Sequence, residues 1–304
     1  MTIAEAVTVK LNAGRCELGE GPNYDRHSNT AWWFDIVDRK LLEHQFNSGM
    51  TVTHELPCMG SVIARIDAQR QLVAMEDGLY VRQIAEGRLT RIAELEADNP
   101  VTRSNDGRVH PSGRLWIGTM GRNAEDRAGA IYWSDGVEVR SLYREISIPN
   151  SICFSPDGCT GFFADTKLNT VWRVTLNPQD GMPKGEPEVF LTAANLPLGG
   201  SFDGSVTDTN GVLWNASWGG GAISGFAPDG THVRTYEVPA AQTSCPVFVG
   251  RELDKMLVTT AWQGYSRAEW NADPGAGYTF VLDGKFNGLA ETEFRLPEDL
   301  MVLT

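Results

Sequence analysis

The feature that most constrains the fold of this chain is a short pattern that is repeated six times. Each unit is a polar turn followed by a brief apolar run that ends in small or polar residues. The runs are spaced roughly 40 to 52 residues apart and end near Asp35, Glu76, Thr119, Thr166, Ser217 and Ala261. This period is typical of a propeller blade. The repeat therefore predicts an all-β chain folded as a six-bladed β-propeller with four-stranded antiparallel blades.

The segments between the repeats read as further strands of the same blades. A second strand such as "NTVWRVTLN" or "AISGFAPDG" follows the run, and "VEVRSLYRE" and "HVRTYEVP" give third strands. Turns such as Pro228-Asp229-Gly230 would close the hairpins. A β-sandwich is the alternative, but a sandwich gives no reason for a repeat of this period. Because no Pro/Ser-rich linker divides the chain, residues 1–304 are expected to form a single domain.

Composition narrows the class of protein. The 304 residues carry a formal net charge of −13 and no run of Lys or Arg, which argues against a nucleic-acid partner. The five cysteines are odd in number and form no C-x-x-C pair, so we expect buried, reduced thiols. The N-terminus lacks the features of a signal peptide, and no apolar run is long enough for a membrane helix. A soluble, cytoplasmic protein without a membrane partner is expected, and the sequence indicates no oligomeric state.

Candidate site residues follow from the propeller prediction. The innermost strands of a propeller line a central channel, so polar residues just before these strands can reach its axis. Polar side chains stand at a similar distance ahead of the hairpin turn in four blades, and each of these blades supplies at least one that carries oxygen: Glu20 in "LGEGPNYD", Arg103, Asn105 and Asp106 in "RSNDGRVHPSGR", Asn150 in "PNSICFSPDG" and Asp203 in "FDGSVTDTNG". Asp106 is interpreted as a turn or supporting residue.

Glu20, Asn150 and Asp203 together suggest a cation site. Two carboxylates meeting on one axis would repel each other unless a cation lay between them. An all-oxygen donor set favours Ca²⁺, Mg²⁺ or Mn²⁺ over a structural zinc, and three protein ligands leave positions for water and substrate. Each residue also has a simpler interpretation when it is considered alone. Glu20 could pair at the surface, Asn150 could belong to a turn, and Asp203 could form an Asx-turn.

Other chemistries have less support. The chain contains no G-x-S-x-G elbow and no H-E-x-x-H, so neither a hydrolase serine nor a zincin helix is expected. The histidines are scattered, and His27 and His110 lie in turns where we expect solvent to reach them. Trp218 and Trp262 end their strand runs and could face the mouth of the channel.

These motifs, taken together, resemble the SMP-30/gluconolactonase/regucalcin-like family of six-bladed propellers. The resemblance rests on "LGEGPNYD" with "WWFDI", "RSNDGRVHPSGRLWIGTM", "PNSICFSPDG" with "FADT", and "FDGSVTDTNGVLWNASWGGG". It implies a sugar lactonase with one divalent cation, Ca²⁺ first, with Zn²⁺, Mn²⁺, Mg²⁺ and iron as alternatives. The family's metal ligands correspond to Glu20, Asn150 and Asp203. Its substrate contacts correspond to Arg103 and Asn105, and Asp203 would also be the general base.

One segment departs from the family pattern. Where some members carry an acidic residue after "GTM", this chain reads "GTMGRNAED", with Arg122 and Asn123 near that position. A guanidinium there would suit an anionic sugar lactone, although Arg122 could equally point to solvent. The expected reaction is hydrolysis of an aldonolactone to the open acid. The alternatives are a non-catalytic calcium-binding regulatory propeller and a metal-dependent phosphotriesterase or other lactone esterase.

Overall fold

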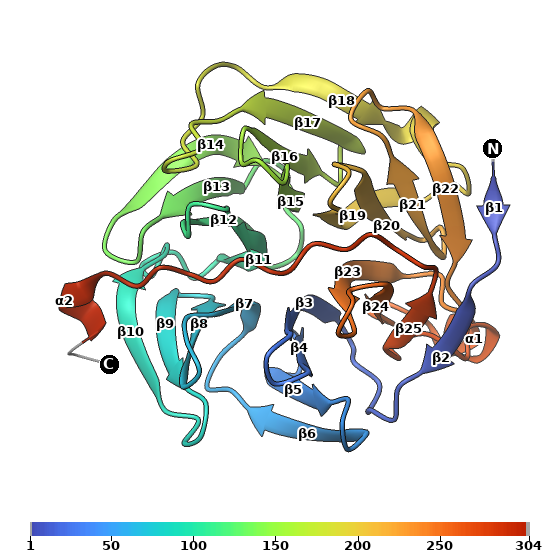
Figure 1. Ribbon diagram of the computed structural model, residues 1–304, viewed down its shortest axis with the longest axis horizontal. Coiled ribbons are helices and arrows are strands. Elements are labelled where there is room, and N and C mark those ends of the chain that lie inside the picture. The colour runs from blue at the N-terminus through green and yellow to red at the C-terminus, as the bar shows by residue number, and fades with distance from the viewer. Residues whose placement is uncertain (1, 302–304) are drawn as a thin grey trace.

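The computed structural model describes residues 2–301 and shows six antiparallel sheets in a ring around a central axis (Figure 1). Written from the innermost strand outward, the first sheet contains β3 (Gly19–Asp25), β4 (Thr30–Asp35), β5 (Lys40–Gln45) and β6 (Met50–Glu55). The second contains β7 (Gly60–Arg65), β8 (Arg70–Met75), β9 (Gly78–Gln83) and β10 (Leu89–Glu94). The third contains β11 (Thr102–Val109), β12 (Leu115–Gly121), β13 (Gly129–Ser134) and β14 (Val139–Ile146). The next two are β15 (Pro149–Phe154), β16 (Thr160–Asp165), β17 (Thr170–Thr175) and β18 (Glu188–Thr192), which the short 3-10 turn η1 (Ala193–Asn195) follows; and β19 (Ser201–Thr207), β20 (Leu213–Trp218), β21 (Ala222–Phe226) and β22 (His232–Glu237). The predicted six-bladed propeller is confirmed.

The sixth sheet joins the two ends of the chain. It contains β23 (Thr243–Val249), β24 (Lys255–Thr260) and β25 (Phe280–Asp283), and its outermost strand is the N-terminal β2 (Val7–Lys10). β2 runs antiparallel to β25, with Val7 opposite Asp283 and Lys10 opposite Phe280. β1 (Ile3–Ala4) adds a fifth strand, parallel to β22, on the preceding sheet. Each innermost strand contacts the next, and β23 contacts β3, so the ring is closed.

Burial of the second strand explains why the apolar run of the sequence repeat does not alternate with polar residues. All six residues of β4, "TAWWFD", are buried. Both faces of such a strand are covered by neighbouring blades, so its side chains need not alternate between apolar and polar. The outermost strand β6 shows the opposite pattern and is mainly exposed or partly exposed. The repeat therefore marks the strands that pack blade against blade.

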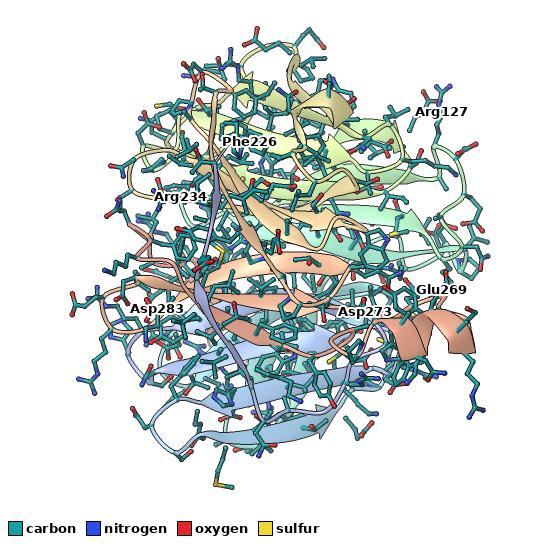
Figure 2. All side chains as sticks on the ribbon, turned by 90° about the vertical axis from the view of Figure 1, so that its right-hand side faces the viewer. Arg127, Phe226, Arg234, Glu269, Asp273 and Asp283 are labelled. Atoms are coloured by element: carbon teal, nitrogen blue, oxygen red, sulfur yellow. The ribbon has the colours of Figure 1, made fainter. Side chains whose placement is uncertain are left out.

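The two faces of the ring differ. On one face, residues 284–297, here called the C-terminal strap, cross the ring from β25 toward α2 (Glu298–Met301) near β10 (Figure 1). The strap is anchored by the buried side chains of Phe286 and Phe294. Arg127, after β12, and Glu269, in α1 (Arg267–Ala272), lie at one edge of Figure 2, and Asp283 lies toward the other. Neither helix within residues 2–301 has the length and apolar character needed to cross a membrane.

Two local expectations can be compared with the structure. His110 is fully buried, so the expectation that solvent reaches it is wrong. Its ring nitrogens pair with Ser112 Oγ at 2.8 Å and the Gly158 carbonyl at 2.9 Å, which joins adjacent blades and satisfies the buried ring. All five cysteine thiols are free. Three are buried, whereas Cys58 and Cys159 are partly exposed.

The closure of the ring gives a first prediction. Deleting residues 1–10 removes β2 and leaves the backbone edge of β25 unpaired, so the midpoint of thermal unfolding should fall by at least several degrees. Deleting residues 1–5 removes β1 but retains β2, and should cost much less. Circular dichroism melts of the two truncated proteins would measure the difference. Equal melting temperatures would show that β2 does not hold the ring together.

Candidate functional site

The innermost strands share a local irregularity at the level of the predicted site. In all six, the pairing with the second strand shifts register: at Glu20/Asn23, Gly60/Val62, Ser104/Gly107, Asn150/Cys153, Phe202/Ser205 and Thr243/Pro246. A bulge turns a side chain away from the regular alternation of a strand and often lies next to a functional site. Glu20, Arg103, Asn105, Asn150 and Asp203 therefore lie within the innermost strands, at or beside these bulges, rather than in the loops before them.

The bulges surround a cavity of about 180 Å³ at one end of the axis. Its walls are formed by Leu18, Glu20, Arg103, Asn105, Met120, Ala124, Ile148, Asn150, Thr166, Asp203, Trp218 and Gln263. Five of the predicted site residues thus border one space, although they come from four blades. Trp218 also lies there. Trp262 instead lines a separate surface groove beside α1, where its ring meets Trp270 edge to face.

Glu20 and Asp203 are buried carboxyl groups with strongly perturbed acidity. Burial raises the pKa of Glu20 to about 8, Asp106 adds to the shift, and the Gly21 N–H and Arg103 oppose it. Burial also raises the pKa of Asp203 well above its usual range, and the charges of Glu20 and Asp106 raise it further. Two negative charges facing each other in a water-poor site are costly, and a bound cation would offset that cost.

A glycine follows each of these two acids, and in both cases its backbone N–H bonds to the preceding carboxylate. Gly21 has φ +53°, and a Cβ there would lie 1.9 Å from the Ser61 carbonyl oxygen on the neighbouring innermost strand. A Cβ on Gly204 would lie 2.3 Å from Cys245 Sγ. Only glycine allows the inner strands to approach this closely while the acids face the axis.

The amide of Asn150 is oriented by hydrogen bonds to its own blade and to the preceding one. Thr166 Oγ1 donates to the Phe202 carbonyl at 2.7 Å, so its oxygen is available to accept from Asn150 Nδ2 at 2.8 Å. This arrangement turns Asn150 Oδ1 toward Asn105, whose Nδ2 donates to it at 3.1 Å. The neighbouring Ser151 has φ +54°, an uncommon conformation for a residue with a side chain, which points to local strain in this bulge.

Arg103 and Asn105 extend this network along β11. Arg103 Nη1 donates to Asn105 Oδ1 and to the Ser104 carbonyl, both at 2.8 Å. Burial lowers the pKa of Arg103 to about 10, which still leaves the guanidinium charged at neutral pH. The Asn105 amide uses its two N–H groups on the Pro149 carbonyl and Asn150 Oδ1. Asn105 therefore holds both Arg103 and Asn150 in place.

The structure places Arg122 and Asn123 outside the cavity wall. Arg122 Nη1 lies 3.1 Å from Glu76 Oε2, and its Nε donates to the Pro100 carbonyl at 2.8 Å. Asn123 is exposed, and its Nδ2 donates to Glu125 Oε1 at 2.9 Å. Both side chains thus have partners within the protein, and their predicted contact with substrate stays a prediction.

Three buried aspartates support the site, and the sequence predicted at most a minor role for each of them. Asp106 is buried and accepts backbone N–H groups from Gly107 at 2.8 Å and Ile152 at 2.7 Å, so it binds the bulge of β11 to that of β15. Asp35 accepts the N–H of Leu18, and Asp165 accepts the N–H of Ile148. The repeated "FD" and "AD" at the ends of β4 and β16 could have identified these two aspartates, because each stands at the end of a second strand, beside the segment that leads into the innermost strand.

The residues at the axis fit a hard divalent cation. Two carboxylates and one oriented amide oxygen border the same cavity, and the buried acids lack a full counter-charge. No group of three or more His, Cys, Asp or Glu side chains is placed to hold a metal ion within residues 2–301. The candidate set here has two carboxylates, and its third donor is an amide, which is not one of those four residue types.

Comparison with known proteins agrees with this architecture. A family model described as SMP-30/Gluconolactonase/LRE-like region matches residues 18–262. The chain belongs to this family. A protein of Rhizobium meliloti (strain 1021) that carries the provisional name sugar lactone lactonase is 49% identical over 94% of this chain and 96% of its own length. The L-arabinolactonase of Azospirillum brasilense is 31% identical over 92% of this chain and 93% of its own.

A solved structure gives the same result for the fold. The calcium-binding protein regucalcin of Agrobacterium tumefaciens str. C58 superposes with a TM-score of 0.94 at 48% identity. The match covers 97% of this chain and all of that chain. Family membership therefore extends over the blades that supply the cavity wall.

The raised pKa values of the buried acids predict how cation binding should depend on pH. Below about pH 8, metal-free Glu20 holds a proton that a cation must displace, so the association constant for Ca²⁺ should rise with pH between 6 and 8. The expected slope is about tenfold per pH unit for each proton released. Calorimetric titrations in buffers of different ionisation enthalpy would count the protons. A pH-independent affinity, or the same slope in Glu20→Gln, would contradict the assignment of Glu20.

Proposed function

We propose that this protein hydrolyses an aldonolactone to the open aldonic acid, with one divalent cation held by Glu20, Asn150 and Asp203. One observation carries the proposal. Two buried carboxylates, an oriented amide and a buried arginine border one cavity. The names of the relatives supply the substrate class, since they include a sugar lactone lactonase and an L-arabinolactonase.

A bound cation would supply the Lewis acid that polarises the lactone carbonyl. Asp203 borders the same cavity and would accept the proton of the attacking water. Arg103 still has N–H groups available beyond its bonds to Ser104 and Asn105 and would hold sugar or carbonyl oxygens. The closed ring fixes these groups before substrate arrives, so little reorganisation is needed.

The surroundings of Arg122 favour a neutral lactone over an anionic one. The guanidinium is already paired with Glu76 and bonded to the Pro100 carbonyl. An anionic substrate would have to compete with Glu76 for it.

The apolar part of the cavity wall favours a second candidate substrate class. Leu18, Met120, Ala124, Ile148 and Trp218 would suit the ring of a less polar lactone or a phosphotriester. The regulatory alternative is supported by the description of the Agrobacterium relative as a calcium-binding protein. A lactone and phosphotriester panel assayed with and without chelator separates all three. A regulatory propeller would bind Ca²⁺ without turnover, whereas an esterase would prefer the less polar esters.

Asp203 offers the most direct test of the proposed chemistry. Asp203→Asn removes the proton acceptor and one charged ligand, so the turnover number for an aldonolactone should fall by about 100-fold or more. Asp208→Asn is the matched control. Asp208 is equally buried in the turn after β19, but it bonds only backbone N–H groups and Trp214 Nε1. This variant should lose stability and keep its turnover. Full turnover in Asp203→Asn would exclude it as the base.

Arg122 can be tested by the choice of substrate. If Arg122 only pairs with Glu76, Arg122→Gln should change kcat/KM by less than about threefold for neutral and carboxylate-bearing aldonolactones alike. Competition between the two substrates in one reaction, followed by chromatography, would measure the ratio directly. A wild-type preference for the anionic lactone that disappears in Arg122→Gln would reverse the conclusion and make Arg122 a substrate contact.

A further inference from the structure

The C-terminal strap places one acidic side chain at the end of the axis opposite the cavity. Glu291 Oε1 lies 2.6 Å from Nη1 of Arg108, which belongs to the innermost strand β11. Both side chains are largely withdrawn from solvent, at 12% and 13% exposure. Beside them the strap leaves a cavity of only about 30 Å³, room for about one water molecule. The strap thus closes this end of the ring.

Arg108 in turn connects the strap to the candidate site. It lies two residues after Asp106, which accepts the Ile152 N–H and so holds the bulge that carries Asn150. Burial, the largest single effect, disfavours the charged form of Arg108, but Glu291, Asp106 and the other acidic groups nearby together outweigh it, so the pKa of Arg108 is raised. Arg108 in turn opposes the rise in the pKa of Asp106. Buried charges therefore interact along the axis from the cavity to the strap.

The formal charges along this axis can be counted. The carboxylates are Glu20, Asp106, Asp203 and Glu291, and the guanidinium groups are Arg103 and Arg108. When all are ionised, two negative charges remain, which is the charge that one divalent cation neutralises. Arg122 and Glu76 at the cavity rim pair with each other and leave this count unchanged. In an interior with little water, an imbalance of one charge acts over several ångströms.

We propose that Glu291 is a positioning residue that tunes cation affinity from the opposite face of the ring, by neutralising Arg108. The inference rests on the proposed cation site. Without Glu291, the positive charge of Arg108 would be balanced by Asp106 alone and would oppose a cation among Glu20, Asn150 and Asp203. The strap would then have a second role besides stabilising the fold, because the charge of Glu291 would bring the net charge along the axis to the value that one divalent cation neutralises.

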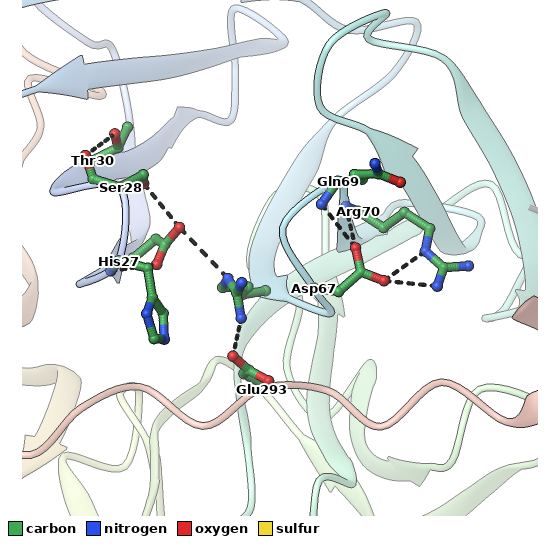
Figure 3. A network of polar contacts seen from close by, with 9 residues as sticks. His27, Ser28, Thr30, Asp67, Gln69, Arg70 and Glu293 are labelled. Atoms are coloured by element: carbon green, nitrogen blue, oxygen red, sulfur yellow. Dashed lines mark hydrogen bonds and ion pairs between the residues drawn. The ribbon is translucent and has the colours of Figure 1, made fainter.

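The strap provides its own control. Glu293, two residues further on, also pairs with an arginine, Arg65. Figure 3 shows Glu293 on the strap, with a dashed line to its partner. This contact differs in two ways. Glu293 is about half exposed, and Arg65 has a second acidic neighbour in Asp25 at 3.6 Å. Loss of Glu293 should therefore cost little and should leave the axis unchanged.

The experiment measures Ca²⁺ binding to chelator-treated full-length protein by calorimetry, with thermal melts of each variant. Glu291→Gln should weaken Ca²⁺ binding about tenfold or more, and Glu293→Gln should stay within about twofold of wild type. The double variant Arg108→Met/Glu291→Gln removes both charges and restores the count, so its affinity should return toward wild type even if its melting temperature does not. A purely structural contact would change the melting temperature without this loss and recovery of affinity.

The outcomes separate this inference from the proposed function. Wild-type protein that binds no divalent cation would refute the proposed cation site itself. Wild-type binding with equal affinities for Glu291→Gln and Glu293→Gln would refute only the role of Glu291. If Glu291→Gln weakens binding and the double variant is equally weak, the contact acts through shape rather than charge, and the charge argument is overturned.

Discussion

The pairing of β2 with β25 joins the two ends of the chain and completes the sixth blade. Val7 to Lys10 complete a sheet whose other strands come from the opposite end of the chain, and this brings β23 against β3. Glu20, near the start of the first blade, and Asp203, in the fifth, face one cavity only because the ring is closed. The hydrogen bonds of one short outer strand therefore hold together a site to which they contribute no side chain.

Within that ring, the site is organised by the cost of burying charge. Glu20, Asp106 and Asp203 are all buried near one another, and each has a raised pKa. The fold offsets part of this cost with backbone N–H groups from glycines, with Arg103 and with Arg108. The remaining deficit of positive charge would favour a cation in the cavity. The same features that reduce the stability of the metal-free protein would thus favour binding.

The two faces of the propeller differ in their access to solvent. The face with α1 and the β12–β13 loop opens the cavity, whereas the C-terminal strap closes the opposite end. Closure excludes water from the centre of the ring and lengthens the reach of each charge there. A catalytic site on this scaffold consequently depends on segments that do not touch the substrate, among them Asp35 and Asp165, which fix the chain before β3 and β15.

The number of blades and five of the polar residues that border the cavity could be predicted from the sequence, whereas Arg122 and Asn123 lie outside the cavity wall. The apolar repeat reports burial on both faces, and acids beside glycine in "GEG" and "FDGS" stand at matching positions in their blades. It could not place Asn150 Oδ1, because that orientation depends on Thr166 and Phe202 from neighbouring strands. It also gave no sign of the partners of Arg122 or of the Arg108–Glu291 pair, which join distant segments. Only the tertiary structure decides such contacts, because periodicity records the environment of a residue along its own strand and not which strand lies opposite.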